Sequence, residues 1–116
     1  MYDTNNIFAK IINKDIPCDL VFEDAKVIFF HDIRPQAKIH ILGVPKANVV
    51  NLSDFVQTCG QEEVYYFFQK INEVVRKYDL QKTGYRLITN EGINSNQEVP
   101  HFHVHILGGE KLGGLN

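Results

Sequence analysis

The sequence from Pro100 to Gly109, PHFHVHILGG, places three of the chain's five histidines two residues apart. Successive side chains of a β-strand point to opposite faces of the sheet. In a strand, His101, His103 and His105 would therefore share one face. Consecutive imidazoles on that face would lie about 6.6 Å apart. The opposite face is apolar: Phe102, Val104 and Ile106. The pattern therefore predicts a strand with one core face and one face of ionisable rings.

Imidazole titrates near neutral pH, so this face can hold neutral nitrogens that attack and protonated nitrogens that donate. Such a mixture suits chemistry at phosphorus, in which one ring is the nucleophile and its neighbours protonate the leaving group. A fourth histidine, His40, lies on another predicted strand. The alternatives are the solvated face of an edge strand and a zinc site. We disfavour both, because solvation does not select histidine and no paired carboxylate or thiolate stands at ligand spacing.

Length and composition predict one globular domain, residues 1–116. Hydrophobic residues make up 44% and charged residues 22% of the chain, which argues against a fibrous repeat. A net charge of −2 offers no basic field for a nucleic-acid polymer, so any nucleotide ligand should be small and locally bound. No apolar run is long enough to span a membrane, and no leader sequence is recognisable. Cys18 and Cys59 stand far apart, which fits free thiols and a cytoplasmic location.

Hydrophobic periodicity predicts the other elements. Period-two runs indicate strands at 20–23, 27–31, 38–45 and 85–90. Helical stripes indicate a short helix at 5–13 and a long one at 61–78, with Thr58 and Gln61 resembling a capping box and Asn51 capping a helical turn before it. This order, with short connections, favours an α+β fold: a mainly antiparallel five-stranded sheet with one long and one short helix. We expect the histidine face to be an open cleft that no helix covers.

The residues from His101 to Leu107, followed by two glycines, resemble the histidine triad motif of nucleotide hydrolases and transferases, the HIT family. Two further stretches, HDIRPQAKIHILGVPK (31–46) and TNEGINSNQEVPH (89–101), resemble nucleotide-binding segments of its purine nucleoside phosphoramidase branch, particularly in bacterial members. The resemblance covers nearly the whole chain. It implies a HIT-like fold, a single HIT domain, a purine nucleotide as small-molecule substrate and a homodimer.

For the histidines, the resemblance implies a separate role for each ring. His103 attacks the α-phosphorus of a nucleoside monophosphate ester or amide, and water hydrolyses the nucleotidyl-histidine that forms. His105 contacts the α-phosphate and the leaving group, His101 supports the neighbouring rings, and His40 completes the polar cluster. A neutral nucleophile also needs its distal nitrogen protonated and held by an acceptor, commonly a backbone carbonyl.

The resemblance also implies nucleotide contacts outside the triad. Asp32 would accept hydrogen bonds from both ribose hydroxyls, with a turn aspartate as the alternative, and Ile33 would line the base pocket, with core burial as the alternative. Asn90 and Gln97 would hold the phosphate or leaving group, or else cap the loop. Glu98 and Val99 would also contact the nucleotide, and the backbone amides of residues 96–99 would donate to phosphate oxygens.

The third triad position favours hydrolysis, because the nucleotidyl transferase branch has glutamine where this chain has His105. An amine departs poorly unless it is protonated, and a histidine beside the nucleophile is placed to donate. A phosphoramidate such as adenosine 5′-phosphoramidate or an AMP-lysine conjugate therefore fits. Two alternatives remain: a dinucleoside polyphosphate hydrolase and a nucleotide-binding interaction module with incidental hydrolysis. No cofactor is required, no metal ligand is assigned, and zinc binding is not expected to be essential.

Overall fold

The computed structural model of the protein describes residues 1–115; Asn116, the last residue of the predicted domain, lies outside the described residues. The central element is a five-stranded sheet in the order β1-β2-β3-β5-β4, in which every neighbouring pair is antiparallel. Its strands are β1 (Leu20–Glu23), β2 (Val27–His31), β3 (Ile39–Pro45), β4 (Tyr85–Ile88) and β5 (Val104–Gly108). The predicted α+β fold with a mainly antiparallel five-stranded sheet is confirmed.

The helices are α1 (Ile7–Ile12), α2 (Leu52–Thr58), α3 (Gln61–Lys77) and α4 (Leu80–Thr83), with a 3₁₀ turn at Ile93–Ser95. Asn51 caps α2 as predicted, because its Oδ1 accepts from the backbone N–H of Asp54 at 2.9 Å. The predicted capping box before α3 is wrong. Thr58 is itself helical, its hydroxyl donates to Asp54 at 2.9 Å, and Gly60 is the N-cap of α3.

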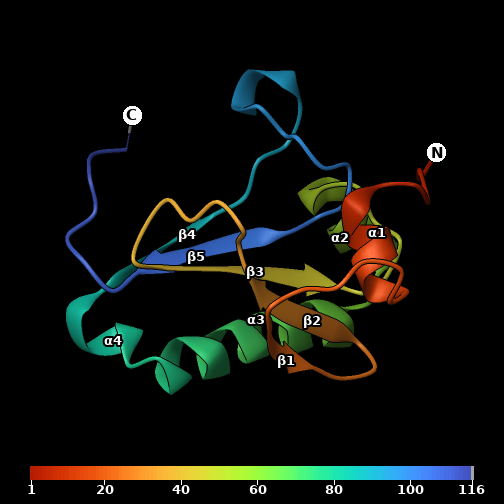
Figure 1. Cartoon of the computed structure of the whole chain (residues 1–116). Coiled ribbons are helices and arrows are strands. Elements are labelled where there is room, and N and C mark those ends of the chain that lie inside the picture. The colour runs from red at the N-terminus through yellow and green to blue at the C-terminus, as the bar shows by residue number, and fades with distance from the viewer. Residues whose placement is uncertain (116) are drawn as a thin grey trace.

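Apolar side chains pack on both faces of the sheet, and α3 and α4 lie beneath it in Figure 1. The larger cluster joins Ile41, Val104 and Ile106 of the sheet to Phe67 and Ile71 of α3. On the opposite face, Phe8 and Ile11 of α1 pack against four sheet residues: Ile28, Phe30, Leu42 and Val44. The histidine face is therefore partly covered by α1, and the expectation that no helix covers it is wrong.

Strand β5 is shorter than predicted, because it begins at Val104 opposite Gly43 of β3. The preceding residues diverge from β3, and the N–H of Phe102 donates instead to the carbonyl of Val49 at 2.8 Å. Phe102 stays buried and stacks on Phe55 with ring centroids 4.9 Å apart. This anchor keeps the side chains alternating between core and histidine face beyond the strand's hydrogen-bonded part.

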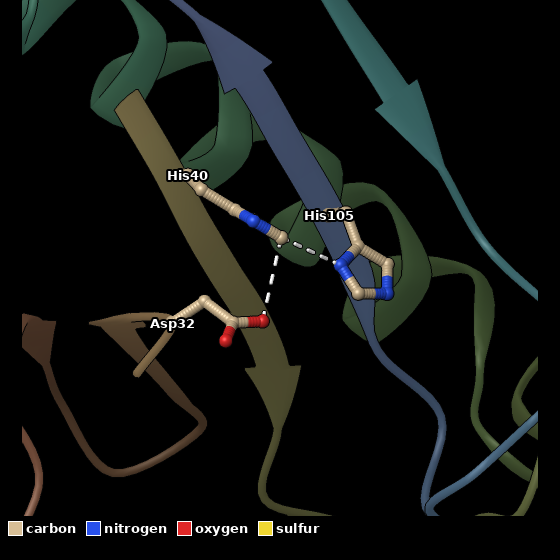
Figure 2. A group of neighbouring side chains, drawn as sticks. All are labelled: Asp32, His40 and His105. Carbon is tan, nitrogen blue, oxygen red and sulfur yellow. Dashed lines mark hydrogen bonds and ion pairs between the residues drawn. The ribbon is translucent and has the colours of Figure 1, made fainter. Parts of the chain in front are cut away.

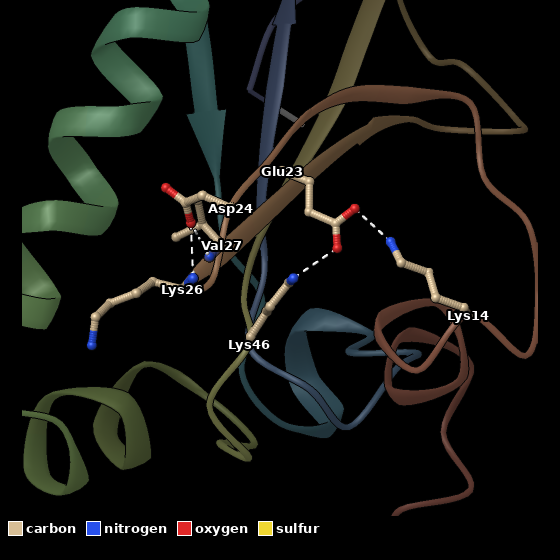
Figure 3. Close-up of polar contacts among 6 residues, drawn as sticks. All are labelled: Lys14, Glu23, Asp24, Lys26, Val27 and Lys46. Carbon is tan, nitrogen blue, oxygen red and sulfur yellow. Dashed lines mark hydrogen bonds and ion pairs between the residues drawn. The ribbon is translucent and has the colours of Figure 1, made fainter.

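Polar contacts hold the β1–β2 hairpin and tie it to its neighbours (Figure 3). In the turn, Oδ1 of Asp24 accepts from the backbone N–H groups of Lys26 at 2.8 Å and Val27 at 3.0 Å. Glu23 at the end of β1 pairs with Lys14, which follows α1, and with Lys46, which follows β3. Through Glu23, the segment after α1 is held against the sheet.

Two further sequence expectations concern thiols and membranes. Cys18 and Cys59 are both free, as predicted. Within residues 1–115, no helix has the length and apolar character needed to cross a membrane.

Candidate active site

Three residues from neighbouring strands meet on the histidine face: Asp32 directly after β2, His40 on β3 and His105 on β5 (Figure 2). Nε2 of His40 lies 2.9 Å from Nδ1 of His105 and 3.4 Å from Oδ2 of Asp32. The His103 and His105 rings are 5.0 Å apart between centroids, closer than the strand repeat suggested, and tilted by 65°. The structure thus assembles Asp32 and three histidines into one cluster.

The hydrogen bonds of His40 determine which of its nitrogens carries the proton. The backbone N–H of Gln36 donates to Nδ1 of His40 at 2.9 Å, so Nδ1 holds a lone pair. In the neutral ring the proton then lies on Nε2, which donates to Nδ1 of His105. Neutral His105 must carry its own proton on Nε2. The cluster therefore presents a fixed N–H donor on His105.

For His103, one backbone contact fixes the opposite tautomer. Its Nδ1 lies 2.8 Å from the carbonyl oxygen of His101. A carbonyl oxygen only accepts, so Nδ1 carries the proton and Nε2 keeps its lone pair. The edge of the Phe8 ring supports the His103 ring from α1, with centroids 4.9 Å apart. Nε2 is therefore the nitrogen of His103 that has a free lone pair.

Both nitrogens of His101, which is 0% exposed, are in hydrogen bonds beneath α1. Its Nε2 donates to the carbonyl oxygen of Pro45 at 2.7 Å, and its Nδ1 accepts from the hydroxyl of Tyr2. His101 therefore has no face turned to solvent, and the supporting role that the family resemblance implied stays a prediction.

Burial shifts the protonation of all four histidines in the same direction. Burial lowers the pKa of His103, although the hydrogen bond to His101 and the charges of Asp32 and Glu98 act in the opposite direction. Burial and the nearby His103 and His40 rings lower the pKa of His105 to about 4. Burial also lowers the pKa values of His40 and His101. The lowered pKa values therefore favour neutral rings at neutral pH over the expected mixture of neutral and protonated rings.

Asp32, His40 and His105 also form a candidate metal site, since one ligand atom from each lies within 4.8 Å of the others. A metal-binding histidine uses one nitrogen lone pair and donates the N–H of the other nitrogen to an acceptor. His40 has the reverse arrangement, because its Nδ1 accepts from Gln36 and its Nε2 carries the proton. These residues do not fit a zinc ion without breaking the Gln36 contact.

The proposed nucleoside contacts lie at the edge of the cluster. Asp32 is half-buried, and its Oδ1 accepts from the backbone N–H of Arg34 at 2.8 Å, so it is both a turn residue and a neighbour of His40. Ile33 is 85% exposed, which rules out the alternative of core burial. An exposed isoleucine beside the carboxylate offers an apolar surface to a flat base.

The loop before the triad places the remaining predicted residues. Thr89 donates to the backbone carbonyl of His103 at 2.9 Å, so Asn90 lies next to the triad segment. The amide of Gln97 is engaged within the loop: Nε2 donates to Val50 at 2.8 Å, and Oε1 accepts from Gly92 at 3.0 Å. Glu98 is exposed, and Val99 packs against the smaller apolar cluster. Gln97 thus braces the loop, as its alternative interpretation predicted.

Sequence reasoning missed the groups that set the tautomers. Gln36 acts through its backbone N–H, and Pro45 through its carbonyl, so neither side chain carries a signal. Tyr2 stands alone ahead of α1 and belongs to no periodic pattern. Phe8 was part of the predicted helical stripe, but the stripe did not reveal that it packs against His103.

The geometry defines a class of protein in which a neutral imidazole, oriented by a backbone carbonyl, lies beside a polar cluster that contains a carboxylate. Comparisons with known proteins agree. The sequence profile of the HIT domain matches residues 13–112. An uncharacterized HIT-like protein of Rickettsia prowazekii is 44% identical over 115 residues, which cover 99% of this chain and 96% of that protein.

Two further similarities concern proteins with a described activity or a solved structure. The purine nucleoside phosphoramidase of Escherichia coli is 37% identical over 109 residues, covering 94% of this chain and 91% of that enzyme. The crystal structure of a HIT family hydrolase from Legionella pneumophila superposes with a TM-score of 0.87 at 35% identity, covering 94% of this chain and 96% of that chain. The chain therefore belongs to the HIT family.

Proposed function

We propose that this protein hydrolyses purine nucleoside 5′-phosphoramidates, cleaving the P–N bond through a nucleotidyl-histidine intermediate. The observation that carries the proposal is the lone pair on Nε2 of His103, held by the 2.8 Å hydrogen bond from Nδ1–H to the carbonyl of His101. Family membership and the similarity to the E. coli phosphoramidase support the same reaction.

In the first step, Nε2 of His103 forms a bond to the α-phosphorus while the P–N bond breaks. The departing nitrogen takes up one proton. Neutral His105 carries a single proton, on Nε2, because its Nδ1 accepts from His40. It therefore has no additional proton to give to the leaving amine. We assign it the role of donating a hydrogen bond to a phosphate oxygen, and the proton on the leaving amine comes from solvent.

In the second step, water attacks phosphorus and the bond between phosphorus and Nε2 of His103 breaks. The water returns one proton to solvent, so the overall reaction converts phosphoramidate and water into nucleoside monophosphate and amine. The Nδ1–H of His103 keeps its carbonyl acceptor throughout, which stabilises the positive charge that the nucleotidylated ring carries.

Nucleotide recognition in this proposal uses the edge of the cluster. The Asp32 carboxylate accepts from the ribose hydroxyls, and Ile33 contacts the base. In the loop, the N–H groups of Asn96 and Gln97 already donate to Ile93 and Gly92. We therefore assign the phosphate contacts of that segment to the backbone N–H groups of two residues: Glu98 and Val99.

The proposal is tested with a fluorogenic adenosine phosphoramidate and the His103→Ala variant. Turnover should fall by several orders of magnitude, on the order of 10³ or more, because removing a nucleophile abolishes the covalent route. His31→Gln is the matched control, since His31 contacts Tyr78 and lies outside the cluster, and it should retain wild-type turnover. Intact-mass measurement of the quenched reaction should reveal an added nucleotidyl group on the wild type.

Other outcomes select the alternatives. Nucleotide binding without an adduct or turnover would indicate an interaction module. Faster cleavage of dinucleoside polyphosphates than of phosphoramidates would indicate a polyphosphate hydrolase. Turnover that survives His103→Ala would reject His103 as the nucleophile.

We also propose a cytoplasmic homodimer. Strand β4 lies at the sheet edge and exposes Tyr85 and Leu87, at 40% and 41%. Helix α3 exposes Tyr65 and Phe68. Apolar side chains on an unpaired edge strand favour pairing with a second copy. Size-exclusion chromatography with light scattering should give twice the mass of the 13.3 kDa chain, and a monomer at all concentrations would reject the proposal.

A further inference from the structure

The segment ahead of α1 is held in a defined turn directly beside the triad. Asn6 is buried and caps α1, with its Oδ1 accepting from the N–H of Ala9 at 2.9 Å. Its Nδ2 donates to the carbonyl of Asp3 at 2.7 Å, and Asn5 N–H donates to the Asp3 carboxylate at 2.9 Å. The residue before this turn, Tyr2, is thereby brought over His101.

The contact between Tyr2 and His101 has a determined direction. Nε2 of His101 carries the proton, because it donates to the carbonyl of Pro45 at 2.7 Å. Nδ1 of His101 therefore only accepts, and the hydroxyl of Tyr2 must donate to it. The two rings meet edge to face, with centroids 5.5 Å apart. His101 is thus held at both nitrogens by two separate segments of the chain.

Residue 101 also carries the carbonyl that orients the nucleophile. Its oxygen accepts the Nδ1–H of His103 at 2.8 Å. Phe8 packs edge-on against both rings, 6.4 Å from His101 and 4.9 Å from His103 between centroids. These contacts join the ring of His101, its peptide carbonyl and the ring of His103 into one packed unit. Tyr2 contacts the unit at the His101 ring.

We propose that Tyr2 is a positioning residue for His103: its hydroxyl locks the His101 ring, and the locked residue presents its carbonyl to Nδ1–H of the nucleophile. The role rests on the proposed function, since it concerns the attack by His103. Tyr2 contacts His101 and would act on His103 only through it. Its removal should slow nucleotidylation while leaving nucleotide binding intact.

The test compares Tyr2→Phe with Tyr66→Phe. Both variants lose one tyrosine hydroxyl hydrogen bond in a partly buried place, but Tyr66 bonds Asp24 at the β1–β2 turn, away from the triad. Rates are measured per folded molecule, well below the unfolding temperature. Tyr2→Phe should lower kcat by about 5–20-fold with KM changed less than about two-fold, whereas Tyr66→Phe should leave both unchanged.

A purely structural role for Tyr2 predicts a different result. Both variants would then lose stability, and kcat per folded molecule would stay at the wild-type value. That result, or an equal fall of kcat in both variants, would overturn the proposal.

A second readout does not need turnover. Imidazole ¹⁵N spectra should report the proton of His103 on Nδ1 in the wild type and in Tyr66→Phe. In Tyr2→Phe, the Nδ1 signal of His103 should shift and its proton should exchange faster with water. A wild-type protein without phosphoramidase activity would refute the proposed function, and unchanged His103 signals in Tyr2→Phe would refute the role of Tyr2.

Discussion

His103 donates its Nδ1–H to the backbone carbonyl of His101, 2.8 Å away. Only one residue, Phe102, stands between the two in the chain. Its side chain points the other way, into the core, where it is 1% exposed. A core residue and a neighbouring carbonyl together therefore determine which nitrogen of His103 is free. Several measurable properties follow from this arrangement.

The acid limb of the pH–rate profile should lie below pH 6.5. Attack requires neutral His103, and burial lowers the pKa of this ring from the ordinary 6.5. As pH falls, activity is lost only when pH passes the lowered pKa, so kcat/KM should be constant from about pH 8 to about pH 6.5. The measurement is kcat/KM against pH with a simple alkylamine phosphoramidate. An acid limb centred above 6.5 would contradict the lowered pKa.

The Asp32→Ala substitution should weaken discrimination between ribose and deoxyribose. With the carboxylate lost, kcat/KM for the adenosine substrate should fall by about 10–100-fold, because the two charge-assisted hydrogen bonds that we propose to the ribose would disappear. The 2′-deoxy substrate should lose less. Asp15→Ala removes an exposed carboxylate elsewhere and serves as the control. Equal losses on both substrates would assign Asp32 to holding His40 rather than the ribose.

Metal removal should leave the reaction intact. The tautomer of His40 places a proton where a zinc ion would bind, since Nδ1 accepts from Gln36 N–H. Dialysis against a chelator should change kcat by less than about two-fold. Restoration of a lost activity by added zinc, measured beside a mock-dialysed sample, would refute the tautomer assignment.

Stability should decrease as pH falls from 6.5 toward about 5, above the range where carboxyl groups titrate. The folded-state pKa values of His40, His101, His103 and His105 are lowered, so the unfolded chain binds more protons in this window. The free energy of unfolding is therefore greatest above pH 6.5. Urea titrations at several pH values test this, and His105→Gln should show a smaller pH dependence than the wild type.

Gly43→Ala should destabilise the sheet. A Cβ at this position of β3 would lie 2.7 Å from the ring of Phe29, which is fully buried and stacks on Phe67. Overpacking of a rigid core ring costs about 1–3 kcal/mol. Gly113→Ala is the matched control, because it lies outside the helices and strands and a Cβ there meets nothing within 4 Å. Equal unfolding free energies for the two variants in urea would contradict the prediction.

Most of the secondary structure was predictable because it follows from local patterns. Alternation predicted strands at 38–45 and 85–90, and the structure has them at 39–45 and 85–88; the helical stripe likewise predicted α3. The long helix was expected one residue beyond Lys77. The errors arose where a distant partner decides the outcome. Residues 101–103 look like strand, but the N–H of Phe102 donates to the carbonyl of Val49. Thr58 looks like a cap but is the last residue of α2.

The sequence alone determined the candidate site residues, because two-residue spacing puts three histidines on one side of an extended chain whatever the rest of the fold does. It also determined the sheet class through short connections and period-two runs. Only the tertiary structure decided the protonation of those histidines. Their tautomers depend on backbone groups of Gln36, Pro45 and His101, and their lowered pKa values depend on burial. Hydrogen bonds to backbone atoms and loss of solvent are properties of packing, which no spacing of side chains encodes.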